Sequence, residues 1–346
     1  MALQESRGEQ LMIELQARDA WNQRDYVGAQ QLAERAASVA AASADDAGWW
    51  NATFLVAEAL RKQGRMQQSK EIAEQLEVHA LTRESKALRA KAATLMSFAL
   101  QGTGDLAQAV TAARAAVAWA GAEPGQKGTQ MEAQNALIAA LADSDLFEEA
   151  WQECQILAEL LATEPPTQTT GMGHWAIGNV AFLLTHIEEG VSHHQFAAKH
   201  LSPTNDLDLW ARFNRGSAQF RLAAGVIEPE TLECIERAEL ASSIVGGTER
   251  DRLELKLTRA HWLVLTGQFD AAVEQLTAII EKKHLLASHM AAQAHLLLGQ
   301  ALSARGGVAE AVVNFKMSEE LFLQSGAKDR AASVQALARE IREATT

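Results

Sequence analysis

The feature of this sequence that most constrains its fold is a small residue that returns about every 40 positions along the chain. The set is Ala29, Ser69, Ala109, Ala150, Gly190, Thr231, Ala272 and Ala311. Successive members are 40, 40, 41, 40, 41, 41 and 39 residues apart. A fixed period of this length indicates a repeat architecture, in which one unit cannot bury its apolar face alone. Stacking against the next unit buries that face, so the chain should fold as one continuous array.

Other positions keep the same register. Three residues before the small residue stands an apolar or aromatic one: Tyr26, Met66, Leu106, Phe147, Ile187, Phe269 and Val308. The sixth repeat departs here, with Glu228 followed by Pro229. Seven residues after the small residue come Ala36, Leu76, Ala116, Leu157, Ala197, Ala238, Ile279 and Ser318. Alternating runs of β-branched residues, the signal for strands, are missing. Each repeat is therefore predicted to be two helices joined by a turn.

The last repeat shows the pattern most clearly. It reads as a helix over 296–302, a glycine turn, and a second helix that reaches Phe315. Gly299 should let the second helix approach closely, and Leu302 should fill the seam between the two. Gly306 makes the turn, and similar turn glycines occur at Gly64, Gly104, Gly225 and Gly267. Ala311 is predicted to lie where the two helices cross.

This pattern resembles the tetratricopeptide repeat, a helix–turn–helix unit with small residues where its helices cross. The match covers residues 9–325, and its clearest instances are Gly299 with Ala311 and Gly267 with Ala272. The usual period of the family is ~34 residues, and here it is about 40. The resemblance implies an all-α, right-handed α-solenoid of about eight helical hairpins. The long period is similar to that of peptide-sensing bacterial regulators.

The domain organisation predicted from this pattern is an array over 1–325 and a capping helix over 326–346. Val334, Leu337, Ala338 and Ile341 follow the spacing of an amphipathic helix, which would cover the C-terminal end of the array. The segment 163–173 contains Pro165 and Pro166 and should interrupt the helices. It reads either as an ordinary surface loop or as a hinge between two halves of four repeats.

The N-terminal helix carries apolar residues on more than one face, among them Leu11, Met12 and Leu15. One interpretation is a helix packed on its own partner with a few exposed side chains. The other is a contact surface for another chain, which includes a homo-oligomer formed through this helix. An uncovered end of a repeat array favours association, and both interpretations stay open.

Composition limits the partners that we expect. The chain has 31 basic and 44 acidic residues, a net charge of −13, which repels phosphate backbones and argues against direct nucleic-acid binding. No run approaches ~18 apolar residues, so no membrane span is expected. Two cysteines, Cys154 and Cys234, do not make a disulfide framework. A cytoplasmic protein is the expectation.

No catalytic constellation is recognisable. Glycine-rich stretches at 102–107 and 171–176 match the dinucleotide fingerprint formally, but neither follows a strand. His186, His193, His194 and His200 cluster in the fifth repeat, without the fixed spacing of three or four converging zinc ligands. We therefore expect no enzyme activity, no cofactor and no metal, and we interpret these histidines as a polar helix face.

A binding site is implied by the resemblance rather than by the spacing. In the tetratricopeptide family the first helix of each pair lines an inner groove, and its fifth and ninth positions point inward. The register of the sixth repeat is uncertain by a residue or two. Carried onto this chain, the positions of the middle repeats give Asn135, Trp175, Asn179, Trp210, Asn214, Arg215 and His261.

These residue types suit an extended peptide. Asparagine amides offer both a donor and an acceptor to a peptide backbone, and tryptophan supplies an apolar wall with a polar tip. The leading hypothesis is a non-catalytic scaffold or adaptor that binds another protein or an extended peptide in its groove. The alternative is a ligand-sensing arm of a regulatory protein, which acts through a partner when a peptide fills the groove.

Overall fold

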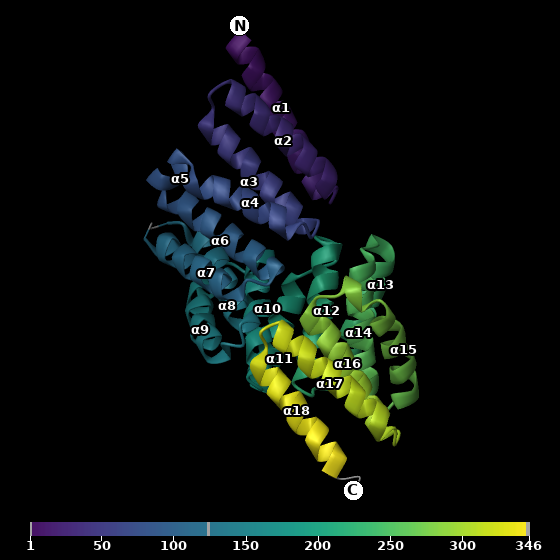
Figure 1. The fold of residues 1–346 in the computed structure, drawn as a ribbon. Helices are drawn as coiled ribbons and strands as arrows, with labels where there is room; N and C mark the ends of the chain where they lie inside the picture. The colour runs from purple at the N-terminus through teal and green to yellow at the C-terminus, as the bar shows by residue number, and fades with distance from the viewer. Residues whose placement is uncertain (1, 123–124, 344–346) are drawn as a thin grey trace. The chain divides into compact units, whose positions relative to one another are not determined.

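The computed structural model describes residues 2–122 and 125–343, and every regular element in these ranges is a helix (Figure 1). Contacts between Cα atoms divide the chain into two compact units, 1–163 and 164–346. Each unit is an array of four helical hairpins. The eight hairpins and the closing helix confirm the predicted all-α fold.

In the first unit the chain runs from purple to teal in Figure 1. Its four hairpins are α1–α2, α3–α4, α6–α7 and α8–α9, with the short α5 between the second and third. The helices are α1 (Ala2–Asn22), α2 (Tyr26–Ala42), α3 (Asp46–Lys62), α4 (Met66–Val78), α5 (Ala80–Glu84), α6 (Lys86–Thr103), α7 (Leu106–Gly121), α8 (Lys127–Asp143) and α9 (Phe147–Ala162).

The second unit continues from teal to yellow. Its hairpins are α10–α11, α12–α13, α14–α15 and α16–α17, followed by α18 and interrupted by one 3₁₀ turn. The helices are α10 (Gln168–Leu183), α11 (Ile187–His200), α12 (Leu207–Ala223), α13 (Pro229–Val245), α14 (Glu249–Leu265), α15 (Phe269–Glu281), η1 (Lys283–Leu285), α16 (Ser288–Ala304), α17 (Val308–Gln324) and α18 (Lys328–Glu343).

The residues at the repeating positions are the ones that pack between the two helices of each hairpin. All eight small residues of the series are buried on the second helix of their hairpin, and so are the eight residues seven positions later. The apolar residue three positions earlier begins the second helix in seven hairpins. In the last hairpin, a methyl group on Gly299 would stand 2.6 Å from the Phe315 ring. Only a glycine lets the two helices approach this closely, as the sequence predicts.

Each hairpin turns through one residue with positive φ. Five of these residues are the expected glycines, for example Gly64 at 77° and Gly306 at 85°. In the last hairpin the C-cap residue of the first helix is Arg305, and two residues later the Gly307 backbone N–H donates to the Leu302 carbonyl oxygen at 2.9 Å. This bond closes the helix end in the manner of a Schellman motif and satisfies a carbonyl that the helix leaves unpaired.

The two ends of the chain differ in their packing. At the C-terminal end, α18 packs on α17 through buried Ala331 and Val334, with the predicted Leu337, Ala338 and Ile341 beside them. At the N-terminal end, Ile13 and Ala17 of α1 are buried against α2. Leu11, Met12 and Leu15 stay exposed, by 58%, 57% and 55%, so α1 packs on its partner and also presents apolar surface.

The segment between the fourth and fifth hairpins is shorter than the sequence suggests. Helix α10 begins at Gln168, because the Thr167 hydroxyl accepts from the Thr170 backbone N–H in a capping box. Only 163–167 is therefore non-helical within the proline-containing segment expected over 163–173. Within the described ranges, no helix is both long enough and apolar enough to cross a membrane.

Candidate peptide-binding face

The first helices of successive hairpins pack side by side in each unit. In the second unit α10 contacts α12, α12 contacts α14, and α14 contacts α16. In the first unit α3 contacts α6 and α6 contacts α8. We call the surface that these helices make the first-helix face of the unit. The predicted site residues belong to these first helices, Asn135 to the first unit and the other six to the second.

Trp175 and Asn179 are half-buried and lie one turn apart on α10. The Trp175 ring packs edge-on against Phe213 of α12, with centroids 5.7 Å apart. Its indole Nε1 is buried and has no hydrogen-bond partner. Gly216 leaves space for this ring, since a methyl group there would stand 2.9 Å from it. Trp175 is thus partly a packing residue between two first helices.

Asn179 belongs to a buried polar network. Its Oδ1 accepts from Nε2 of His194 on α11 at 3.0 Å, and Nδ1 of the same ring faces the Ser217 hydroxyl of α12 at 2.8 Å. An acceptor at Nε2 puts the proton on that nitrogen, so Nδ1 accepts from Ser217. Burial, and then the charge of Arg221, lowers the pKa of His194 to about 3. The ring is neutral at pH 7 and joins three helices.

This network limits the use of Asn179 as a probe of binding. A side chain free to bind a ligand would tolerate replacement by alanine without loss of stability. Here, Asn179→Ala would leave the buried N–H of His194 without an acceptor, which typically costs ~1–3 kcal/mol. Asn179 therefore orients His194, and it is not a clean probe of the face.

The register of the sixth hairpin is resolved by its turn. Gly225 has φ 74°, and α13 begins four residues later, whereas most second helices begin two residues after the positive-φ residue. Counted back from that turn residue, Arg215 occupies the position that Trp175 holds in α10. Arg215 is half-buried and pairs with Glu254 of α14 at 2.8 Å. Its cation therefore joins two neighbouring first helices.

The other two candidates on α12 differ from each other. Asn214 is 1% exposed, and its Nδ2 donates to the Trp210 carbonyl oxygen at 2.8 Å. Asn214 is therefore a core residue, and its side chain is not exposed on the first-helix face. Trp210 is half-buried, so part of its ring stays accessible to a partner.

His261 of α14 is half-buried, and burial lowers its pKa to about 4. The imidazole is therefore neutral at pH 7 and offers one donor and one acceptor. Together, Trp210, Arg215 and His261 are the predicted residues of the second unit that combine accessibility with chemistry suited to a ligand.

Asn135 stands on α8 of the first unit, where the structure adds residues that the prediction did not include. Its Oδ1 is buried without a partner. Glu132 stands one turn before it, Glu58 and Arg61 pair on α3, and the Arg61 guanidinium lies over the Phe98 ring of α6. The signal was available, because Glu58, Thr94 and Phe98 occupy the same inward repeat positions. Arg61 follows Glu58 by three residues and Glu132 precedes Asn135 by three, so each lies one helical turn from an inward repeat position.

The histidines of the fifth hairpin form a separate group. Nδ1 of His174 on α10 lies 2.8 Å from Nδ1 of His193 on α11, the Phe196 ring packs at a tilt against His174, and His200 packs in the same way against Phe196. Burial, with the charges of His193 and His200, lowers the pKa of His174 to about 4. No group of three or more metal-ligating side chains converges anywhere in the described part of the chain.

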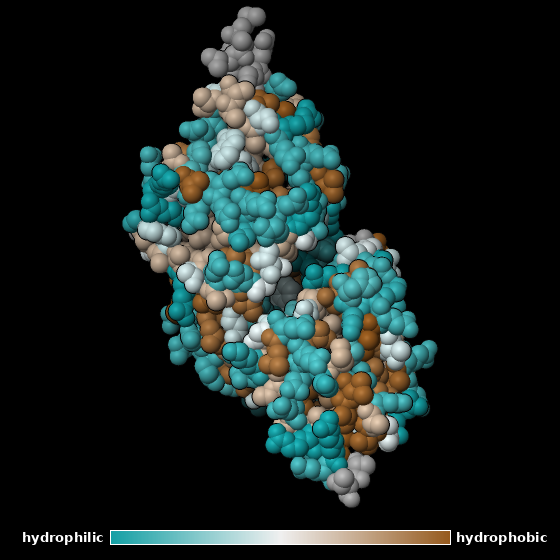
Figure 2. Space-filling model, viewed as in Figure 1, coloured by the Kyte–Doolittle hydropathy of each residue, from teal (hydrophilic) through white to brown (hydrophobic). Residues whose placement is uncertain are grey.

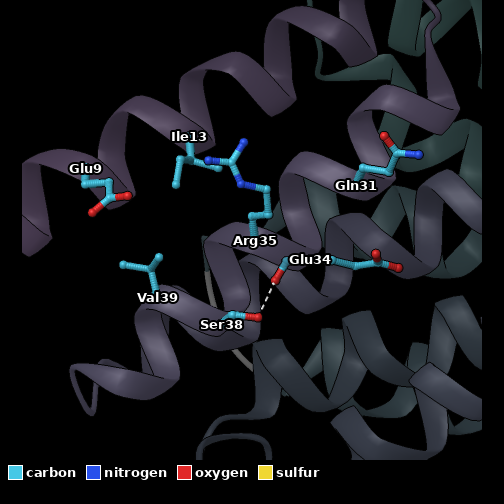
Figure 3. Close-up of a pocket in the computed structure, with 7 residues that line it drawn as sticks. All are labelled: Glu9, Ile13, Gln31, Glu34, Arg35, Ser38 and Val39. Atoms are coloured by element: carbon cyan, nitrogen blue, oxygen red, sulfur yellow. Dashed lines mark hydrogen bonds between the residues drawn. The ribbon is translucent and has the colours of Figure 1, made fainter.

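Two hollows lie between the two helices of a hairpin. The first, of about 490 Å³, lies between α1 and α2 and is lined by Ile13, Arg35 and Val39 among others (Figure 3). The second, of about 610 Å³, runs along the seam of α14 and α15. Exposed hydrophobic residues include Val313 and Leu323 of α17, and Figure 2 shows brown, hydrophobic surface in patches between hydrophilic areas. None of these features brings the predicted residues together.

Comparison with known proteins identifies the fold. No protein-family model and no curated protein match the chain. A Rap protein crystallised with competence and sporulation factor superposes with a TM-score of 0.62 at 11% identity, covering 97% of this chain and 98% of that one.

A second solved structure is a signal-transduction ATPase with numerous domains, with a tetratricopeptide repeat sensor, from Pyrococcus horikoshii. It gives a TM-score of 0.54 at 14% identity and covers 97% of this chain, which spans 50% of that protein. At these identities the likeness concerns the fold. The chain thus has the α-solenoid fold of tetratricopeptide-repeat proteins.

Proposed function

We propose that this protein is a non-catalytic scaffold that binds another protein or an extended peptide on its first-helix faces. The observation that carries the proposal is the presence of accessible side chains suited to a ligand on adjacent first helices. In the second unit α12, which carries Trp210 and Arg215, packs against α14, which carries His261. An aromatic wall, a cation and a neutral imidazole suit a polar peptide backbone with side chains of mixed character.

The reactive groups of the chain favour binding over chemistry. Burial raises the pKa of the Cys154 thiol to about 12 and also raises that of Cys234. A nucleophilic cysteine must be a thiolate, and both thiols are protonated at pH 7. His194 is neutral, and both of its ring nitrogens are occupied by Asn179 and Ser217, so it has no free nitrogen to act as a base.

The experiment is a panning of random ten-residue peptides against the immobilised full chain. Enriched peptides are then measured by calorimetry against Trp210→Ala and against Gln195→Ala, an exposed residue on the second helix α11. An aromatic contact of this kind contributes ~1–2 kcal/mol, so Trp210→Ala should weaken binding roughly five- to thirty-fold. Gln195→Ala should bind like the wild type. Equal affinity of both folded variants would place binding elsewhere.

One observation supports the alternative, a ligand-sensing arm that acts through a partner. The two solved structures described above are a Rap protein complexed with competence and sporulation factor and a protein with a repeat sensor. A short reading frame with a signal peptide beside the gene would favour the sensor. A neighbourhood of secretion or assembly genes would favour the adaptor.

A further inference from the structure

The outward side of α1 is apolar over two helical turns. Leu11, Met12 and Leu15 are each more than half exposed, and exposed Gly8 precedes them by one turn. At 3.6 residues per turn, these four positions fall within about 100° around the helix, on the side away from buried Ile13. They form one contiguous uncharged surface, which we call the α1 face.

The repeat register shows that two residues of the α1 face occupy packing positions. Each was compared with the residues of the other seven hairpins by counting back from the positive-φ turn residue. The residues that correspond to Met12 are buried in all seven: Ala52, Ala92, Ala133, Gly173, Phe213, Leu255 and Ala294. Those that correspond to Leu15 are all buried or half-buried: Leu55, Leu95, Ala136, Ala176, Gly216, Thr258 and Leu297.

In other hairpins, the second helix of the preceding hairpin covers these positions. Ala52 of α3 belongs to a buried cluster with Ala36 of α2, and Leu95 of α6 belongs to one with Leu76 of α4. The first of the described helices is α1, and no described helix lies on its outward side. The α1 face is therefore a helix-packing surface without its helix.

The C-terminal end of the array is built differently. There α18 covers α17, and the exposed positions of α18 hold polar or charged residues and alanine. Repeat arrays need a polar outer face on their terminal element to stay soluble. An end helix with three exposed large apolar side chains instead indicates an interaction site.

The α1 face is complementary to itself. Consider two antiparallel copies of α1 related by a two-fold axis between Leu11 and Met12. Leu15 of each copy then stands level with Gly8 of the other, and the Leu11 and Met12 side chains of both copies meet at the axis. An isologous interface has this reciprocal form. The chain has a net charge of −13, so two copies repel each other at long range, and an uncharged face is the kind that can pair with itself.

Gly8 has the open space that this arrangement requires. A methyl group on Gly8 would meet no atom within 4 Å. Elsewhere in the chain, large side chains pack over glycines where helices approach, as Phe315 does over Gly299. Leu15 of a second copy would make the same type of contact with Gly8.

We propose that the α1 face pairs with the α1 face of a second copy of this chain to form an antiparallel dimer. A single helix pair buries less than the ~1,200 Å² of total surface at the lower limit of stable interfaces. Monomer and dimer should therefore exchange, and the dimer fraction should rise with protein concentration. This dimer does not depend on the proposed peptide binding.

The test is sedimentation velocity of the full chain over a wide range of concentrations. The average mass of the wild type should rise from that of one chain toward that of two. Leu15→Glu places a charge in the apolar contact and should weaken association at least ten-fold, or about 1.4 kcal/mol. Leu240→Glu is the matched control, because this leucine of α13 is 59% exposed and lies in the second unit. It should dimerise like the wild type.

A charge swap at the axis tests the two-fold geometry. Met12→Glu and Met12→Lys should each be monomeric alone, because like charges meet, and should form a mixed dimer when combined. Gly8→Leu fills the space for Leu15 and should weaken the dimer. It should not lower the melting temperature, since Gly8 has no close neighbour and leucine favours helix more than glycine does.

Two results would overturn the proposal. A wild-type chain that stays monomeric at every concentration would leave the α1 face to a helix of a different protein. A dimer that persists in Leu15→Glu would use another surface. Because these variants replace exposed residues, their helical circular dichroism should match the wild type, and the mixed dimer gives a positive result that a folding defect cannot produce.

Discussion

At the residue scale, the turn inside each hairpin requires a residue with positive φ, and three of the eight turns use a residue that is not glycine. The turn residue has positive φ in all eight hairpins, and five of them use glycine. The other three hairpins have Arg24, Asp145 and Thr185 at this position, with φ values of 62°, 58° and 60°. A left-handed conformation costs a residue with a Cβ roughly 1–2 kcal/mol, and a β-branched residue is the least suited to it.

Thr185→Gly should therefore stabilise the protein. The relief of strain is partly offset by the greater freedom of glycine in the unfolded chain, roughly 0.5–1 kcal/mol, so the net gain is about 0.5–1 kcal/mol. Urea denaturation of the two proteins measures it as a rise in midpoint. Gly225→Ala is the reverse control and should lower the midpoint. A lower midpoint for Thr185→Gly would mean that its side chain makes a contact worth more than the strain.

Three histidines predict how stability depends on pH. Burial lowers the pKa of His174 and of His261 to about 4 and that of His194 to about 3, from an ordinary value of 6.5. Below pH 6.5 these three histidines are therefore protonated in the unfolded chain and still neutral in the folded chain. Stability is complete above about pH 6.5 and falls as the pH drops toward 4, by up to about 1.4 kcal/mol per pH unit for each ring.

Urea denaturation at pH 7, 6 and 5 measures this dependence. His261→Gln should make it shallower, since one buried ring no longer titrates. His284→Gln removes an exposed ring and should leave the slope unchanged. Equal slopes for both variants and the wild type would show that His261 is protonated in the folded protein.

At the element scale, the hairpins depend on close approach between their helices. Ala311 is completely buried on α17, and Gly299 on α16 has no room for a methyl group beside Phe315. A larger side chain at such a crossing must push the helices apart, because packed helices leave no space to accommodate it. Specific small residues therefore hold each hairpin at its spacing.

Ala311→Leu should destabilise the protein by ~1–3 kcal/mol through overpacking. Ala309→Leu on the same helix is the control, because Ala309 is exposed and leucine is nearly as good a helix former. Thermal melting followed by circular dichroism distinguishes the two. An unchanged melting temperature for Ala311→Leu would show that the two helices can separate at little cost.

At the scale of the whole molecule, the chain consists of two units, and the boundary between them in the sequence falls between Thr163 and Glu164, just before Pro165 and Pro166. Each unit has four hairpins and its own buried side chains. Since repeat arrays are stabilised by contacts between neighbours in the sequence, a unit needs little from distant repeats. Whether the proline segment acts as a hinge stays a prediction.

The fragment 164–346 should therefore fold alone, with a helical circular dichroism spectrum and a cooperative melt. The fragment 187–346 lacks α10 and so loses the partner of Gly190 and the Asn179 acceptor of His194. It should melt at a lower temperature or remain partly unfolded. A disordered 164–346 fragment would show that the second unit depends on the first.

The sequence by itself determined the features that depend on local periodicity. The crossing residues, the turn glycines, the number of hairpins and the packing side of α18 all follow from spacing, because each unit of such an array contacts only its neighbours.

The tertiary structure decided what depends on the exact placement of neighbouring helices. A turn two residues longer before α13 put Arg215 on the accessible face and Asn214 in the core. The bond from His194 to Asn179 joins residues 15 apart on different helices, and the grouping of Glu132 with Arg61 and Lys91 spans three hairpins. Repeat spacing fixes which side of a helix a residue occupies. Which atom its side chain meets depends on the packing of helices from different repeats.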